Sequence, residues 1–261
     1  MTTDTPIAHR KTGPLPTLIA LCLGLGLVSD VATRKAEASQ PMTSTQPAAQ
    51  KLSARQQAIP LIAAFMATSD MPRLNAALNQ GLDAGLTVSE TKEILVQLYA
   101  YVGFPRSLNA LNELMTVVQA RQQRGIQDAP GREPSRAIAT GEALLAAGMA
   151  NQTRISGGPV KGPVFDFAPV INQFLQTHLF GDIFERDNLD WQSRELATVG
   201  ALAATPGVES QLRSHMRASL RVGLSVEQLR KVIEVLDTHG DEQSAKRAGT
   251  ALAQALAASG G

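Results

Sequence analysis

The chain has 261 residues, with 24 Lys and Arg against 23 Asp and Glu, and only 4% of its residues are aromatic. That length suffices for one large or two small domains. A net charge of +1 with so few aromatic rings argues against a nucleic-acid partner, which needs a basic surface.

The N-terminal segment has the layout of a secretory signal peptide. A basic stretch at residues 9–11 (His-Arg-Lys) precedes an apolar run at 15–28, and Ala-Glu-Ala at 36–38 offers a cleavage site between small residues. The apolar run is short for a membrane-spanning helix. We therefore expect removal of residues 1–38 and a mature chain that is exported, either periplasmic or secreted, without stable insertion in a membrane.

Two alternatives to a cleaved signal involve the same segment. One is an uncleaved N-terminal anchor; the other is a lipoprotein signal at Cys22, although bulky Leu21 stands where a small residue is expected. Cys22 is the only cysteine, so removal of residues 1–38 leaves none, with 20 basic and 20 acidic residues (24 − 4 and 23 − 3). Disulfides, thiolate metal sites and cysteine redox chemistry are then excluded from the mature chain.

The remaining pattern predicts an all-α fold made of a tandem repeat of one helical unit. Residues 39–50 form a polar, flexible lead-in, and the first repeat spans 51–123. A linker rich in Gly and Pro spans 124–164 and holds one expected short helix at 135–149. The second repeat spans 165–258. No segment shows the strict alternation of a strand.

The repeat is visible in one short motif. Gly85-Leu86-Thr87-Val88 matches Gly223-Leu224-Ser225-Val226, which sets the spacing between equivalent positions of the two repeats. In both copies the Gly is typical of a helix end and the Thr or Ser of the next N-cap. Both copies also fit the capping box, in which Glu90 and Gln228 stand three residues after the cap.

Residues 191–224 predict two antiparallel helices broken at Thr205-Pro206-Gly207. Glu195 lies about ten residues before the break and His215 about ten after it. Each is thus about 15 Å from the turn, and the two reach the same level of the hairpin. A carboxylate and an imidazole between apolar helices form a candidate acid/base pair. A surface or structural ion pair is the alternative, because short motifs often match by chance.

Three pieces of the chain resemble the carboxymuconolactone decarboxylase family, which includes the alkylhydroperoxidase D proteins. They are residues 98–106 (Leu-Tyr-Ala-Tyr-Val-Gly-Phe-Pro-Arg), Arg194-Glu195-Leu196 leading to residues 212–215, and residues 180–184 (Phe-Gly-Asp-Ile-Phe). The resemblance implies an all-helical fold, ring-like oligomers with a homotrimer favoured, and decarboxylation of a lactone carboxylate without metal or organic cofactor. The peroxidase branch needs a Cys-x-x-Cys that is absent here.

The two repeats depart from the family pattern in opposite ways. The second keeps Glu195 and His215, whose counterparts in the first are Gln57 and Ala77. The first keeps the Tyr-x-Gly-Phe-Pro segment, which the second lacks. We therefore expect one composite site per chain, with a catalytic pair from the second repeat and a substrate-binding wall from the first. That wall comprises Tyr101, Phe104 and Arg106. The alternative is that the first repeat is only a scaffold.

Arg106 and Arg213 are the candidates for holding a substrate carboxylate through forked hydrogen bonds. His178 is a further candidate for substrate binding. No metal is expected, since Asp, Glu and His are too scattered for a cluster, and no cofactor is expected either. We interpret the chain as a lyase or isomerase acting on a small organic acid or lactone. A non-catalytic small-molecule-binding or scaffold protein of the cell envelope is the alternative.

Overall fold

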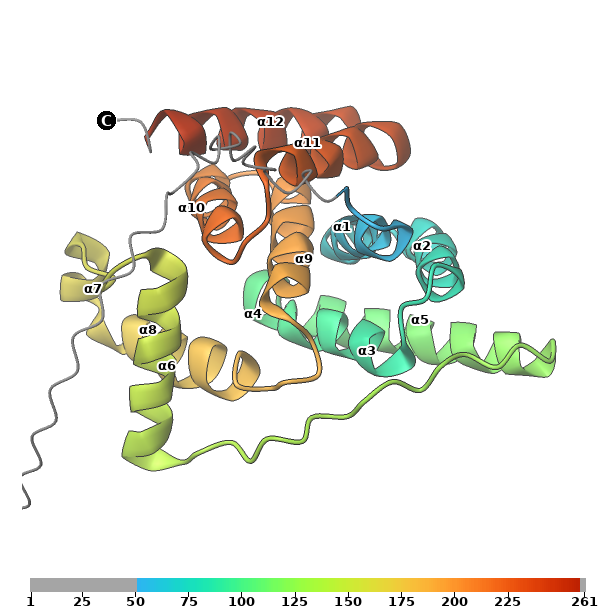
Figure 1. Ribbon diagram of the computed structural model, residues 1–261, viewed down its shortest axis with the longest axis horizontal. Coiled ribbons are helices and arrows are strands. Elements are labelled where there is room, and N and C mark those ends of the chain that lie inside the picture. The colour runs from blue at the N-terminus through green and yellow to red at the C-terminus, as the bar shows by residue number, and fades with distance from the viewer. Residues whose placement is uncertain (1–50, 259–261) are drawn as a thin grey trace, which may run out of the picture. The chain divides into compact units, whose positions relative to one another are not determined.

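The computed structural model describes residues 51–258, so the expected signal segment and lead-in lie outside the described residues. Within this range the chain forms helices and no strand, and the predicted all-α fold is confirmed (Figure 1). None of these helices combines the length and the hydropathy that a membrane span requires.

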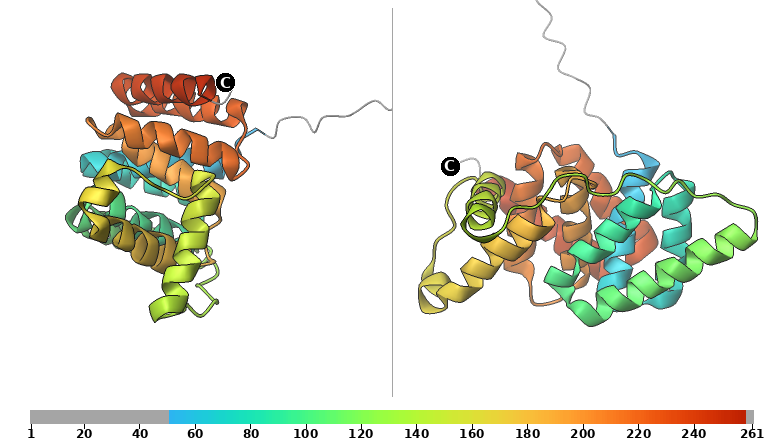
Figure 2. Two further views of the ribbon diagram at one scale, coloured as in Figure 1. Left: turned by 90° about the vertical axis from the view of Figure 1, so that its left-hand side faces the viewer. Right: turned by 90° about the horizontal axis from the view of Figure 1, so that it is seen from below.

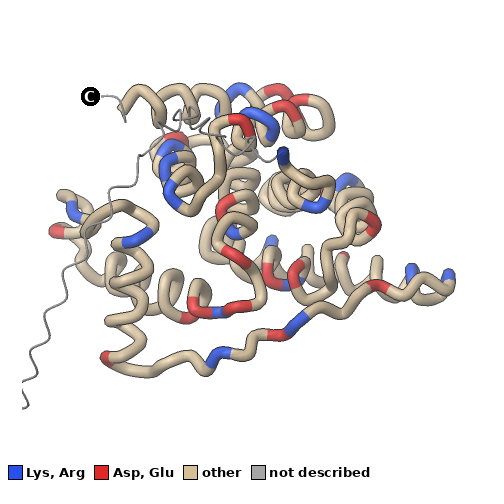
Figure 3. Tube along the Cα trace, viewed as in Figure 1, with Lys and Arg blue, Asp and Glu red and all other residues tan. Residues whose placement is uncertain are grey.

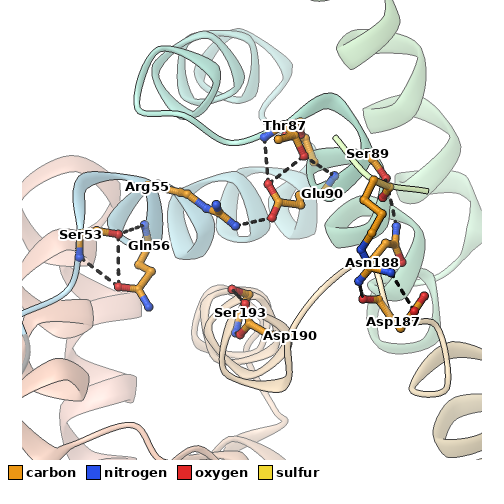
Figure 4. Close-up of polar contacts among 12 residues, drawn as sticks. Ser53, Arg55, Gln56, Thr87, Ser89, Glu90, Asp187, Asn188, Asp190 and Ser193 are labelled. Atoms are coloured by element: carbon orange, nitrogen blue, oxygen red, sulfur yellow. Dashed lines mark hydrogen bonds and ion pairs between the residues drawn. The ribbon is translucent and has the colours of Figure 1, made fainter. Parts of the chain in front are cut away.

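The first half of the described chain contains five helices. They are α1 (Ala54–Thr68), α2 (Met71–Asp83), α3 (Val88–Gln97), the single turn α4 (Tyr99–Val102) and α5 (Phe104–Gln123). Capping boxes start α1 at Ser53 and α3 at Thr87, because each hydroxyl and the third side chain after it satisfy backbone groups reciprocally (Figure 4). Arg55 of α1 pairs with Glu90 of α3 and ties the two helices together.

The second half repeats this succession. It consists of α9 (Trp191–Ala204), α10 (Glu209–Arg221), α11 (Val226–Val235), the π-helical turn η2 (Leu236–Gly240) and α12 (Glu242–Ala257). The bounds of α10 and α11 follow those of α2 and α3 at one constant spacing, and the start of α12 follows that of α5 at the same spacing. Gly85 and Gly223, again equally spaced, end their helices at φ 94° and 99°, where glycine is favoured. This regularity supports the predicted tandem repeat.

Four further helices lie between the halves: α6 (Gly141–Ser156), α7 (Pro163–Phe167), α8 (Pro169–Phe174) and the π-helix η1 (Leu175–Ile183). The short helix expected at 135–149 is α6, which begins at Gly141 instead and extends to Ser156. The segment before it is extended because α3 holds it. The backbone amides of Val88 and Ser89 donate to the carbonyls of Ala129 and Pro130 at 3.0 and 2.9 Å.

The core is centred on the contact between α1 and α9. Every residue of α1 from Ala58 to Ala67 is buried, and every residue of α9 from Ser193 to Ala204. α12 and α5 lie on opposite sides of this helix pair (Figure 2). Because α9 is buried on all sides, any polar residue along it is forced into the interior.

Charges of both signs gather on two neighbouring segments, the extended stretch before α6 and the loop before α9 (Figure 3). Asp187 of the loop accepts from the backbone amide and the hydroxyl of Ser135 at 2.8 and 2.7 Å. Arg132 pairs with the same carboxylate at 2.8 Å. Behind them, Asn188 donates to the Ser89 hydroxyl at 3.2 Å (Figure 4). The loop that leads into α9 is therefore fixed to both α3 and the linker.

Candidate active site

Glu195 and His215 meet inside the α9–α10 hairpin, as the sequence predicts. Gly207, at φ 85°, supplies the left-handed turn between the two helices. The Nδ1 atom of His215 lies 2.8 Å from Oε2 of Glu195. The Glu195 side chain is 0% exposed and that of His215 is 16% exposed. The imidazole is thus the member of the pair that reaches the surface.

Local interactions hold each member in place. Asp190 caps α9, accepting from the Ser193 backbone amide at 2.8 Å, and so sets where Glu195 falls on the helix. On α10, Ser219 donates to the His215 carbonyl at 2.8 Å, while Leu212 and Met216 are buried. The Nε2 atom of His215 has no hydrogen-bond partner within residues 51–258, so this nitrogen is free to exchange a proton.

Tyr101 of α4 joins the pair from the first half of the chain. Its ring centroid lies 5.4 Å from that of His215, with the rings at 78°. Burial, and next the negative charge of Glu195, raise the pKa of Tyr101 far above its usual value, and nearby Thr198 and Arg194 oppose this more weakly. The hydroxyl therefore stays protonated at neutral pH and is available as a donor.

Two polar atoms at this point are buried without a hydrogen-bond partner among the described residues: the Tyr101 hydroxyl and Oε1 of Glu195. Buried polar atoms in folded proteins are nearly always paired, so exceptions of this kind need an explanation. Here one donor and one acceptor of the same candidate site are both unpaired. The two come from different halves of the chain, as the composite hypothesis requires.

Phe104 and His178 lie around Tyr99 instead. Phe104 is 61% exposed and stacks on the Tyr99 ring at 4.1 Å. His178, on η1, bonds to Asp182 at 2.7 Å, and its ring centroid lies 5.5 Å from that of Tyr99. Neither Phe104 nor His178 bonds to Glu195 or His215, nor do their rings stack on the imidazole. The structure therefore places both outside the immediate surroundings of the pair.

The two arginines expected to hold a carboxylate are not joined to the pair. Arg106 is exposed and donates back to the carbonyl of Val102, one turn earlier, at 3.0 Å. Arg213 makes no hydrogen bond or ion pair within the described range, and its Nε is buried. This arrangement gives no support to a carboxylate clamp beside His215.

Sequence reasoning missed the largest buried polar network of this region. Arg194 is 0% exposed and lies 3.0 Å from Glu93 and 2.9 Å from the side-chain oxygen of Gln97. Arg186 pairs with the same Glu93 at 2.8 Å. Burial lowers the pKa of Arg194, against the opposing charge of Glu93. The available signal was its position directly before Glu195, on a helix without a polar face.

This network links α3 to α9. The amide of Gln97 also donates to the Arg194 carbonyl at 2.8 Å and to the Thr198 hydroxyl at 3.1 Å. Because α4 begins two residues after Gln97, the network fixes where Tyr101 lies relative to α9. Among the residues that the structure describes, no group of three or more His, Cys, Asp and Glu side chains is arranged to hold a metal ion.

Comparison with known protein families finds a likeness over the second half of the chain. The model described as the carboxymuconolactone decarboxylase family matches residues 169–258, which include α9, α10 and both members of the pair. No curated protein matches the chain. Residues 169–258, with Glu195 and His215 among them, are thus similar to the carboxymuconolactone decarboxylase family.

Proposed function

We propose that this protein is a cofactor-independent acid/base enzyme that acts on a small organic acid or lactone. One observation carries the proposal: the buried carboxylate of Glu195 holds Nδ1 of His215 at 2.8 Å, and Nε2 has no partner among residues 51–258. A carboxylate accepts a hydrogen bond from the Nδ1–H group and so favours the tautomer in which Nδ1 keeps the proton and Nε2 carries a lone pair. An imidazole in this state serves as a general base near neutral pH.

The same nitrogen supports two related reactions. In an isomerisation, Nε2 removes a proton from carbon and returns it at another position. In a decarboxylation, the carbon–carbon bond to the carboxylate breaks, its electrons move into a conjugated carbonyl or lactone, and protonated Nε2 delivers the proton to carbon. Solvent then restores the proton on His215. Glu195 stabilises the positive charge of the imidazolium in both reactions.

We also propose export and self-association. Export follows from the sequence layout of residues 1–38. Self-association, with a homotrimer favoured, is supported by exposed apolar side chains on α7 and α8, which a monomer leaves in water. Phe167 is 91% exposed. The other exposed apolar side chains on these two short helices are Val164, Val170, Ile171 and Phe174.

The test is a screen of small carboxylic acids and lactones against the mature protein, following substrate loss and release of carbon dioxide. His215→Gln should lower turnover by about 10² to 10⁴, the usual contribution of a positioned acid or base. His239→Gln is the matched control, because His239 is exposed in η2 and takes no part in the pair. Equal loss in both variants would refute a specific role for His215.

A non-catalytic binding or scaffold protein is the second candidate. The observation in its favour is that only 16% of the His215 side chain reaches solvent. Absence of turnover in every protein, together with ligand binding that His215→Gln leaves intact, would favour this candidate over the enzyme.

A further inference from the structure

We propose that Tyr101 is a positioning residue of the Glu195–His215 site, whose hydroxyl donates a hydrogen bond to the free Oε1 of Glu195 and so orients the carboxylate toward the imidazole. The functional meaning of this role rests on the function proposed above, because it concerns the same pair. The structural claim is separate: a hydrogen-bonded group of three side chains joins α4, α9 and α10.

Glu195 and Tyr101 each present a buried polar atom without a hydrogen-bond partner among the described residues. Oε2 of Glu195 is bonded to His215, and Oε1 is buried without a donor. The Tyr101 hydroxyl is buried without an acceptor. A buried donor or acceptor that is left unpaired carries the full cost of its lost hydration. A rotation of the phenol ring or of the carboxylate that brings these two atoms within hydrogen-bond distance would remove both penalties.

Most other donors near Glu195 are already engaged. On α9, Arg194 directs its guanidinium to Glu93, Gln97 and the Arg186 carbonyl. The buried face of α1 is entirely apolar. On α12, Arg247 bonds to the carbonyl of Ala203, more than two turns further along α9. The Nε atoms of Arg194 and Arg213 are also buried without a partner among the described residues. Of these three unpaired donors, Tyr101 is the one whose side chain also packs against the His215 ring.

The charge state and the position of Tyr101 also suit a donor to Glu195. Burial and the charge of Glu195 both keep Tyr101 protonated, which a donor to a carboxylate must be. Its ring is held in place, because it packs against buried apolar side chains of two hydrophobic clusters. The counterpart of Tyr101 in the second half, at the repeat spacing, is His239, which is exposed. The positioning role of Tyr101 is therefore not repeated at the equivalent position of the second half of the chain.

The chain offers a direct test, since Tyr99 and Tyr101 are its only tyrosines. In the Tyr99→Phe variant, ultraviolet absorbance reports the ionisation of Tyr101 alone. We expect that signal to stay protonated until the protein unfolds in alkali. Adding Glu195→Gln removes the neighbouring negative charge, so Tyr101 should ionise at lower pH. An unchanged titration curve in the folded double variant would overturn the proposal.

A second measurement does not require a change at Glu195. Proton NMR of the folded protein should show a downfield resonance for the His215 Nδ1 proton that bonds to Glu195. Tyr101→Phe keeps the ring and removes the hydroxyl, so it should shift or broaden this resonance. Tyr99→Phe should leave it unchanged. An identical resonance in all three proteins would show that Tyr101 only packs against His215.

Neither measurement uses a substrate. If the Tyr101 titration and the His215 Nδ1 proton resonance both change as expected and no turnover is found, the hydrogen bond from Tyr101 is supported and the proposed enzymatic function is refuted. If turnover depends on His215 and neither signal responds, the enzyme stands and the role of Tyr101 fails. Where Glu195→Gln does not fold, as judged by circular dichroism, the Tyr101→Phe spectrum decides alone.

Discussion

Gly200 of α9 lies directly against the backbone of Pro60 of α1: a Cβ atom added to Gly200 would lie 2.6 Å from the Cα of Pro60. Real Cβ atoms essentially never approach that closely, and a shift of backbone costs more than a shift of a flexible side chain. Glycine at position 200 is therefore what lets the two central helices cross at this distance. The crossing positions the whole of α9, including Glu195.

The first prediction concerns this crossing. Gly200→Ala should destabilise the fold by about 1–3 kcal/mol, because an added methyl group in a close-packed interior forces the backbone to shift. Thermal unfolding measures the effect. Gly249→Ala on α12 is the matched control, since a Cβ there meets nothing within 4 Å. That variant should gain about 0.5–1 kcal/mol from its higher helix propensity. Equal effects of the two substitutions would contradict the close approach.

The second prediction concerns the buried charges beside the site. Glu93→Gln removes the carboxylate that pairs with both Arg194 and Arg186, and should cost about 3 kcal/mol because a charge is left buried without its partner. Glu133→Gln removes an exposed partner of Lys92 and should cost under about 1 kcal/mol. Urea unfolding of both variants makes the comparison. If Glu93→Gln lowers the free energy of unfolding no more than Glu133→Gln does, the network around Arg194 is solvated.

The third prediction concerns pH and the extended segment before α6. Hydrogen bonds from the Ser135 amide and hydroxyl, and then Arg132, hold the pKa of Asp187 well below its ordinary value of 3.8. A lowered pKa in the folded state means that Asp187 stabilises the fold above pH 3.8, and that this contribution disappears as the pH falls toward the folded value. The segment at 132–136 should then come loose in acid.

Hydrogen exchange at residues 132–136 tests this. At neutral pH, Asp187→Ala should lower the protection of these amides, relative to the exchange rate of an unfolded chain at the same pH, and acid should do the same in the unaltered protein. Asp166→Ala, at an exposed position of α7, should leave it unchanged. Slow exchange at the Ser135 amide in Asp187→Ala would mean that other contacts hold the segment.

The fourth prediction concerns the composite site. Tyr101→Phe should lower turnover about tenfold, corresponding to the roughly 1.4 kcal/mol of one lost hydrogen bond. From the sequence alone, substitution of Tyr101 or of Arg106 was expected to lower turnover as loss of His215 does. The structure narrows this prediction to Tyr101, because Arg106 is engaged with Val102. Steady-state kinetics of Tyr101→Phe beside His215→Gln make the comparison. Unchanged kinetics in Tyr101→Phe would leave the first half of the chain as a scaffold.

Local signals made most of the fold predictable. Pro206 and Gly207 end and reverse a helix whatever surrounds them, so the hairpin and the meeting of Glu195 with His215 followed from counting residues. The caps at Thr87 and Ser225 act within a single helical turn, and both capping boxes are present. The starts of α3 and α11 were therefore predictable from the sequence alone.

Features that depend on tertiary contacts were not predictable. Nothing in the sequence near His178 signals the π-helix from Leu175 to Ile183. Burial of Arg194 depends on Glu93, which lies in the other half of the chain, so its charge suggested a surface position. The direction of Arg106 is a rotamer choice that spacing does not determine. The predicted start of α6 was wrong, because the linker before it is held in an extended form by α3.

Equivalent helices of the two halves are separated by a constant number of residues, and each half contributes side chains to the site. Tyr101 comes before the linker, whereas Glu195 and His215 come after it. A proteolytic cut between α5 and α6 would therefore leave the phenol on one fragment and the carboxylate–imidazole pair on the other. The contact of Tyr101 with the Glu195–His215 pair would then report association, because it forms only when the two fragments are docked.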